Sequence, residues 1–109
     1  MSATIPGPAE LSKLLPPLYT HEDTKAEDVP IGLKLFNPAG AGTWFLTEYD
    51  PDEDLAFGYA DLGDPTCAEL GYVSLAELRS YKGPLGIGIE RDLYYGDHHT
   101  LLEAMWEEL

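Results

Sequence analysis

The sequence predicts an α+β fold, with a mainly antiparallel sheet of about five strands and three short helices. Five short stretches alternate apolar and polar residues or are rich in aromatic and β-branched residues, as strands are. Three other stretches combine the apolar spacing of a helix with residues that start helices. No linker or internal repeat divides the chain, so we expect one domain over residues 1–109, with residues 1–7 as a loose N-terminal arm.

Each of the three predicted helices has a start signal. The first covers residues 8–15, because Pro8 suits a first helical turn, leucines recur on one face and two prolines follow. The second begins after Ser74 and the third after Thr100, since a glutamate follows each of them three residues later in a capping-box pattern. The third helix is expected to carry one apolar stripe of Leu101, Leu102, Met105, Trp106 and Leu109.

The five predicted strands cover residues 31–36, 43–49, 55–62, 69–73 and 87–95. In the first strand Ile31, Leu33 and Leu35 are expected on one side, because side chains alternate along a strand. The second strand, T-W-F-L-T-E-Y, is rich in aromatic and β-branched residues. Only a short acidic run separates the second strand from the third, so we expect these two to pair as a hairpin.

A glycine-rich stretch at residues 82–96, K-G-P-L-G-I-G-I-E-R-D-L-Y-Y-G, predicts a shaped loop that leads into the last strand. It matches neither of the glycine patterns that bind phosphate. Arg91 is expected to neutralise its acidic neighbours, and a small polar site with Tyr94 and Tyr95 is the alternative. The residues of this structural loop are Gly83, Pro84, Gly86, Gly88, Arg91 and Asp92.

The net charge is −14 on 109 residues, from 20 Asp and Glu against 6 Lys and Arg. A net charge of magnitude about 2–8 is enough to keep a small domain soluble, so the net charge of this chain exceeds what solubility requires. Direct binding to nucleic acid or to an anionic membrane is disfavoured, because both use Lys and Arg. The hydrophobic content of 44% indicates a folded chain. We therefore expect a basic protein partner.

The sequence predicts neither export nor membrane insertion. The N-terminus lacks the basic and apolar regions of a secretory signal. No apolar run approaches the roughly 20 residues of a membrane-spanning helix. Cys67 is the single cysteine, so no intrachain disulfide can form, which fits a reducing cytosol. We expect a soluble, cytoplasmic protein, either a monomer or a dimer.

Five carboxylates fall within seven residues between the second and third strands. If the extended conformation continues, Glu48, Asp50 and Asp52 share one face at intervals of roughly 6–7 Å, twice the rise per strand residue. Nucleic acid carries one phosphate per about 3.4 Å of each strand, so such a row can occupy a channel lined with Lys and Arg. The alternative is a solvated hairpin loop that guards the sheet edge. The candidate partner-binding residues are Glu22, Asp23, Glu27, Asp28, Glu48, Asp50, Asp52, Glu53, Asp54, Asp61 and Asp64.

Metal and catalytic interpretations have less support. The run D-P-D-E-D lacks the central glycine and the distal glutamate of an EF-hand, which leaves at most a weak, nonspecific divalent-ion site. His98 and His99 have no partner at zinc spacing, and a loop pair before a helix explains them. Cys67 has no neighbouring cation or base to activate it. We expect no metal, no cofactor and no enzymatic activity.

Five stretches carry a family resemblance: K-L-L-P-P-L-Y at 13–19, T-W-F-L-T-E-Y-D at 43–50, L-A-F-G at 55–58, L-G-Y-V-S-L-A-E-L at 70–78 and G-P-L-G-I-G-I-E-R-D-L-Y-Y at 83–95. In this order, over nearly the whole chain, they resemble the bacterial and phage family known as domain of unknown function 2958. The resemblance implies a protein that plasmids and phages carry, often beside antirestriction genes, and that acts in the cytoplasm of a bacterial host. It transfers no catalytic residue.

Three functional hypotheses follow, in order of preference. The first is an acidic inhibitor of anti-CRISPR or antirestriction type, a DNA mimic whose carboxylates face the nucleic-acid-binding surface of a host defence nucleoprotein. In this hypothesis exposed aromatic residues such as Trp44 or Tyr95 anchor the contact. The second is an accessory protein-interaction module of plasmid or phage replication or conjugation, with acidity for solubility only. The third is a small enzyme that uses Arg91, Asp92 and one of the two adjacent histidines.

Overall fold

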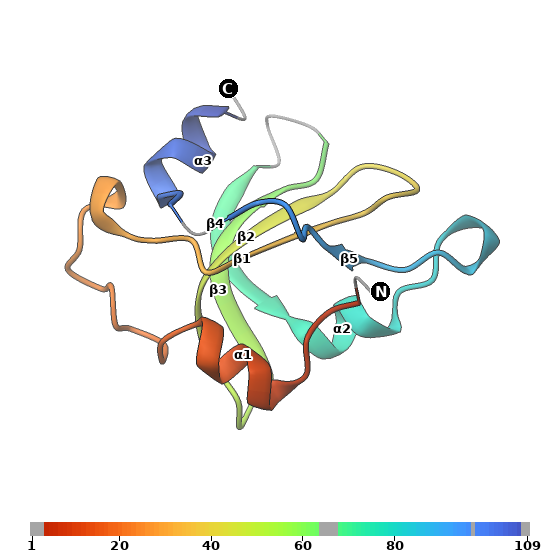
Figure 1. Ribbon diagram of the computed structural model, residues 1–109, viewed down its shortest axis with the longest axis horizontal. Helices are drawn as coiled ribbons and strands as arrows, with labels where there is room; N and C mark the ends of the chain where they lie inside the picture. The colour runs from red at the N-terminus through yellow and green to blue at the C-terminus, as the bar shows by residue number, and fades with distance from the viewer. Residues whose placement is uncertain (1–3, 64–67, 97, 108–109) are drawn as a thin grey trace.

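Five strands form one sheet in which every neighbouring pair is antiparallel (Figure 1). The strands are β1 (Leu33–Phe36), β2 (Thr43–Asp50), β3 (Leu55–Asp61), β4 (Glu69–Ser74) and β5 (Glu90–Arg91), in the spatial order β4-β3-β2-β1-β5. The computed structural model describes residues 4–63, 68–96 and 98–107. The predicted α+β class is confirmed, and so is the pairing of β2 with β3 as a hairpin.

Short helices accompany the sheet: α1 (Pro8–Leu14), α2 (Leu75–Ser80), α3 (Leu101–Glu107) and the 3-10 turns η1 (Ala26–Asp28) and η3 (Pro84–Gly86). The predicted start signals are confirmed, since Pro8 lies in the first turn of α1. The Ser74 hydroxyl accepts the Glu77 N–H at 3.3 Å, and the Thr100 hydroxyl accepts the Glu103 N–H at 3.3 Å. None of the helices in the described ranges is long and apolar enough to cross a membrane.

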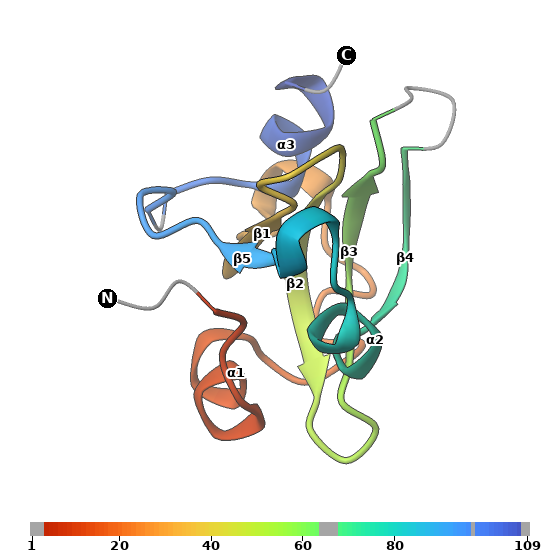
Figure 2. The same ribbon diagram turned by 90° about the vertical axis from the view of Figure 1, so that its right-hand side faces the viewer.

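The helices cover both faces of the sheet. Because successive side chains of a strand point to opposite faces, Phe45 and Leu46 of β2 enter two separate hydrophobic clusters. Leu46 belongs to the cluster of α1 and α2, with Leu11 and Leu75, whereas Phe45 belongs to the cluster of α3, with Leu101. Figures 1 and 2 show α3 at one end of the sheet and α1 and α2 near the other end, beside the β2–β3 turn.

Two predicted apolar positions are wrong. Ile31 precedes β1, and its N–H donates to the His99 carbonyl at 2.9 Å. Its side chain joins the cluster of α3 instead of the cluster that holds Leu33. On α3, Trp106 is 66% exposed, and Ala104 takes a buried position against the sheet. Cys67 and Leu109 lie outside the described residues.

The last strand, β5, is two residues long, which is much shorter than the predicted strand over 87–95. On one side the Gly83 N–H donates to the Ile87 carbonyl at 2.9 Å, within the turn that contains η3. On the other side the Tyr94 N–H donates to the Asp92 carboxylate at 3.0 Å. The backbone hydrogen bonds to β1 extend as far as Asp92, whose N–H donates to the Lys34 carbonyl at 3.0 Å. The local turns on both sides of β5 therefore keep the ladder with β1 short.

A β-bulge interrupts β2 beside β3. Leu46 pairs with Gly58 and Glu48 pairs with Phe57, so Thr47 is the additional residue. The Thr47 side chain is buried, and its hydroxyl donates to the Phe57 carbonyl at 3.1 Å. Simple alternation would place Glu48 on the face of Leu46. The bulge moves it to the face of Phe57, because directly paired residues point to the same side.

Two directly paired glycines of β3 and β4 test this register. A Cβ on Gly58 would lie 2.1 Å from the Phe45 carbonyl oxygen, whereas a Cβ on Gly71 meets nothing within 4 Å. We expect Gly58→Ala to lower the free energy of unfolding by about 3 kcal/mol, because the clash is with backbone. The matched control, Gly71→Ala, is expected to leave it unchanged or raise it by up to about 1 kcal/mol. Urea unfolding measures both, and equal values would contradict the close approach of β2 to Gly58.

Candidate functional site

The acidic run between β2 and β3 does not form one exposed row. Glu48 is only 5% exposed, and Asp50 is half-buried, with its carboxylate accepting the Asp52 N–H at 3.0 Å. Asp52 and Glu53 are exposed at the turn. The expectation that Glu48, Asp50 and Asp52 share an exposed face is therefore wrong, because Glu48 points inward to backbone donors from another part of the chain.

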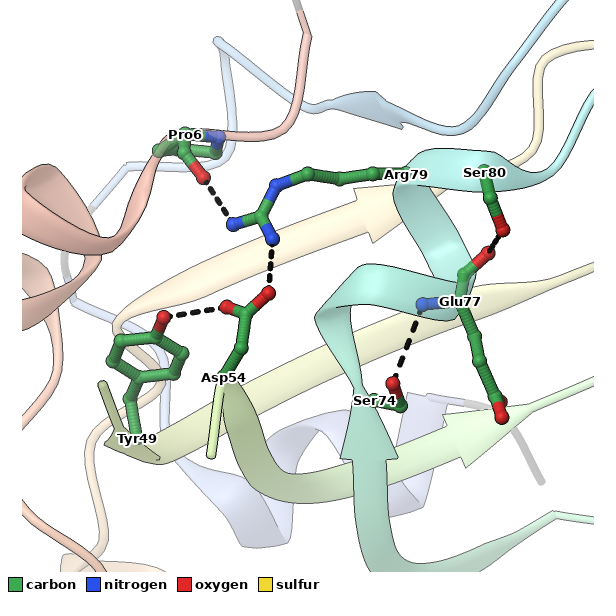
Figure 3. A network of polar contacts seen from close by, with 7 residues as sticks. All are labelled: Pro6, Tyr49, Asp54, Ser74, Glu77, Arg79 and Ser80. Carbon is green, nitrogen blue, oxygen red and sulfur yellow. Dashed lines mark hydrogen bonds and ion pairs between the residues drawn. The ribbon is translucent and has the colours of Figure 1, made fainter. Parts of the chain in front are cut away.

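Asp54 is the centre of a polar network that holds the β2–β3 turn against α2 and the N-terminal segment (Figure 3). Its carboxylate accepts a hydrogen bond from the Tyr49 hydroxyl at 2.5 Å and pairs with the Arg79 guanidinium. The same guanidinium donates to the Pro6 carbonyl at 2.8 Å. The Leu75 N–H, at the start of α2, donates to the Asp54 carbonyl at 3.0 Å. This carboxylate is committed to the fold, so the expectation of a free partner-binding group at Asp54 is corrected.

The Glu48 carboxylate fixes the segment that follows α1. One oxygen accepts the Tyr19 N–H at 3.1 Å, and the other accepts the His21 N–H at 2.7 Å. These charge-assisted hydrogen bonds offset the cost of burying the carboxylate. Tyr19 has a φ of 71°, in the left-handed region that a residue with a side chain rarely adopts. Glu48 therefore holds a strained turn in place above β2.

The same turn closes a groove of about 430 Å³ on the α3 face of the sheet. Glu48, Phe57 and Tyr72 form a row across β2, β3 and β4, because Glu48 pairs with Phe57 and Phe57 pairs with Tyr72. Residues of the connection between α1 and β1, beginning with Tyr19 and His21, line the groove opposite this row. A volume in this range is typical of pockets that bind small groups.

The groove combines aromatic rings with hydrogen-bond acceptors. The Phe57 and Tyr72 rings meet edge to face, with centroids 5.3 Å apart, and the Tyr72 hydroxyl donates to the Tyr19 hydroxyl at 3.4 Å. This hydrogen bond, followed by burial, raises the pKa of Tyr72, and the negative charges of Glu48 and Glu22 act in the same direction. The His21 Nε2 atom is buried and has no hydrogen-bond partner among the described residues.

The remaining candidate carboxylates lie on separate parts of the surface. Residues 22–28, which we name the acidic segment, run beside the groove, and Glu22 lines it. Asp61 is half-buried at the end of β3, where its carboxylate accepts the Gly63 N–H at 2.9 Å. Asp64 lies outside the described residues. The exposed carboxylates of the acidic segment are those of Glu22, Asp23, Glu27 and Asp28.

The glycine-rich loop connects the termini of α2 and β5, and its charged residues reach distant partners. Arg91 pairs with Glu10 of α1 at 2.9 Å, and Asp92 pairs with Lys34 of β1 at 3.4 Å, so Arg91 does not pair with its sequence neighbours as predicted. Gly86 has a φ of 75°, which glycine tolerates. The pairings hold β5 against α1 and β1.

The two histidines before α3 do not converge with Arg91 and Asp92. His99 contacts the Glu103 carboxylate through Nδ1 at 2.8 Å and the Tyr95 carbonyl through Nε2 at 2.6 Å, while His98 is exposed. Residues 4–63, 68–96 and 98–107 contain no group of three or more side chains that could hold a metal ion.

The aromatic anchors proposed from the sequence are packed into the protein. Trp44 packs against the cluster of α1 and α2, and Tyr95 packs against the cluster of α3. The sequence patterns did not indicate the groove aromatics Tyr19, Phe57 and Tyr72 as a site. The strand alternation signalled that Phe57 and Tyr72 each face one side of the sheet, but nothing local signalled that Tyr19 would meet them.

The fold and the groove together define a small acidic α+β protein in which a buried glutamate, Glu48, and aromatic side chains line the same groove. Over residues 9–107 the chain matches the family described as Protein of unknown function (DUF2958), and it belongs to this family. It matches no curated protein and no solved structure at a significant level.

Replacing Glu48 with alanine tests its role in holding the segment after α1. We expect Glu48→Ala to lower the free energy of unfolding by about 2 kcal/mol, because it leaves the N–H groups of Tyr19 and His21 without their acceptor. Hydrogen exchange at these two amides is expected to accelerate more than exchange elsewhere. The control Glu53→Ala, at the exposed turn, is expected to change stability by no more than about 0.5 kcal/mol. Equal effects would contradict the buried role of Glu48.

Tyr49 makes stability depend on pH in the alkaline range. Burial, followed by the hydrogen bond to Asp54, raises the pKa of Tyr49 from 10.0 to about 12, against a smaller opposing effect of Arg79. The unfolded chain releases this proton near pH 10, while the folded protein keeps it until about pH 12. The stabilisation is therefore complete below about pH 10 and is lost as the pH rises through this interval.

We expect the loss of stability between about pH 9 and about pH 11 to be smaller in Tyr49→Phe than in the unchanged protein, because the variant lacks this proton. Urea unfolding at the two pH values measures it. The control Tyr94→Phe removes a hydroxyl from a side chain that is 96% exposed and is expected to leave the pH dependence as it was. The same pH dependence in both variants would contradict the assignment to Tyr49.

Proposed function

We propose that the protein is an acidic inhibitor, of anti-CRISPR or antirestriction type, from a phage or another mobile element. It binds a basic nucleic-acid-binding protein or complex of a bacterial defence system in the host cytoplasm and excludes nucleic acid from it. The observation that carries the proposal is the acidic segment. Its four carboxylates are exposed, and none is ion-paired with a cation in the part of the chain that the structure describes.

The placement of the cations supports this proposal. Of the six Lys and Arg, three are paired away from the acidic segment, in the ion pairs Lys34–Asp92, Arg79–Asp54 and Arg91–Glu10. Lys25 is the only cation within residues 22–28 of the sequence, so four carboxylates against one ammonium leave that segment strongly negative. A negative surface of this kind attracts a basic partner over a Debye length and raises the association rate.

The mechanism we propose is competition. The acidic segment and the exposed Asp52 and Glu53 take the place of phosphates on a positively charged surface, so nucleic acid and this protein cannot bind there together. Binding is expected to weaken as salt is added, because the interaction is largely between exposed charges.

A second candidate function rests on a different surface. Leu85 is 98% exposed and Tyr94 is 96% exposed, on the two turns that flank β5. Leu85 also has a φ of 60°, a strained conformation for a leucine. An accessory module of replication or conjugation that docks through these residues would bind its partner with little dependence on salt.

A pull-down from host lysate at low salt, eluted with a salt step, identifies the partner. The inhibitor proposal expects a nucleic-acid-handling complex that added DNA displaces from the tagged protein. Partners that resist both high salt and DNA, and that are lost in Leu85→Ala or Tyr94→Ala, would support the accessory module instead.

Three double variants show which surface of this protein contacts the recovered partner. Each removes two exposed negative charges: Glu22→Gln with Asp23→Asn, Asp52→Asn with Glu53→Gln, and Glu69→Gln with Glu77→Gln as the control. We expect the first two to slow association several-fold at low salt and to reduce its salt dependence, measured by surface plasmon resonance. The control changes net charge equally, so an identical effect in all three would contradict a localised acidic contact.

A further inference from the structure

The charged residues that line the groove beside the acidic segment are both glutamates. Glu48 and Glu22 both line it, and no Lys or Arg of the described residues does. Among the described residues, Glu48 has no ion pair, although it is almost fully buried. A buried carboxylate without a cation attracts one strongly, because little water remains to screen it.

The polar atoms that line the groove include several that can accept further hydrogen bonds. Each Glu48 oxygen accepts one backbone N–H and keeps a second lone pair for another donor. His21 lines the groove, and its buried Nε2, which accepts a hydrogen bond when the proton is on Nδ1, has no partner in the described part of the chain. The Tyr19 hydroxyl oxygen accepts a hydrogen bond from the Tyr72 hydroxyl and can accept a second one. A group that carries several N–H donors can satisfy these acceptors together.

The aromatic wall favours the same kind of group. Phe57 and Tyr72 line the groove next to Glu48 in the cross-strand row, with their rings 5.3 Å apart. Cations bind aromatic faces, and a planar guanidinium also stacks on them. An apolar side chain in the groove would leave Glu48 and His21 without new partners, and an anion would be repelled.

We infer that this groove binds the guanidinium group of an arginine side chain, which the basic partner of the proposed function presents. A guanidinium carries five N–H donors in a planar fork, which matches a carboxylate flanked by further acceptors and aromatic rings. The acidic segment steers the partner, and the groove receives one arginine as the anchor of the contact. The identification of the basic partner as the protein that supplies this arginine rests on the proposed function. The guanidinium site itself does not.

A peptide titration of the isolated protein tests the site without the partner. The probe is the blocked tripeptide acetyl-Gly-Arg-Gly-amide, compared with the same peptide carrying citrulline, the neutral isostere of arginine, or lysine. Two-dimensional amide NMR spectra report binding through the N–H groups of Tyr19 and His21, which contact Glu48. We expect saturable shifts of these amides with the arginine peptide, and at least tenfold weaker binding of the citrulline and lysine peptides.

Two side-chain variants separate the groove from the general charge of the protein. Tyr72→Ala truncates a groove residue that is 54% exposed, so we expect the variant to fold and to bind the arginine peptide roughly three- to thirtyfold more weakly. The matched control is Tyr94→Ala, which truncates an exposed tyrosine outside the groove and is expected to leave binding unchanged. Phe57→Leu keeps an apolar side chain without the ring and is expected to weaken binding as well.

The inference is overturned if the Tyr19 and His21 amides do not shift, or if the citrulline or lysine peptide binds as tightly as the arginine peptide. It is also overturned if Tyr72→Ala and Tyr94→Ala have the same effect. These outcomes are independent of the pull-down. Arginine binding with no DNA-displaced partner would refute the proposed function alone, and a DNA-displaced partner with no arginine binding would refute only the groove.

Discussion

The hydrogen bonds that the buried Glu48 carboxylate accepts are the interaction on which this part of the structure depends. A desolvated carboxylate needs donors, and the backbone N–H groups of Tyr19 and His21 supply them. These bonds anchor the connection between α1 and β1 above β2 and hold Tyr19 in its left-handed conformation. The groove exists because that connection is held at this distance from β3 and β4.

The acidic residues of the chain divide into two kinds according to their partners. Glu48 and Asp54 are held by backbone amides, a tyrosine hydroxyl or a guanidinium, and they stabilise the contact between distant segments. The carboxylates of the acidic segment are solvated and contribute to the field outside the molecule. Composition alone cannot separate these two kinds, because both contribute equally to a net charge of −14.

The acidic segment and the groove form one continuous surface, since Glu22 belongs to both. In the proposed function they act in sequence: exposed charges govern the approach of a basic partner, and a desolvated site governs how long it stays. This division agrees with the general behaviour of charged interfaces, in which peripheral charges affect association and buried, fully paired groups affect dissociation. The turns around β5, with Leu85 and Tyr94, lie outside this surface.

The sequence by itself determined the α+β class, the helix starts at Ser74 and Thr100, the β2–β3 hairpin and the acidity, because these depend on local periodicity, capping residues and composition. It did not determine which face Glu48 occupies, since one extra residue in β2 reverses the alternation there. Nor did it show that Tyr19 would meet Tyr72, 53 residues away. Such contacts depend on how connections fold back over the sheet. Long-range packing and the hydrogen bonds that a buried carboxylate accepts from distant backbone N–H groups decide this.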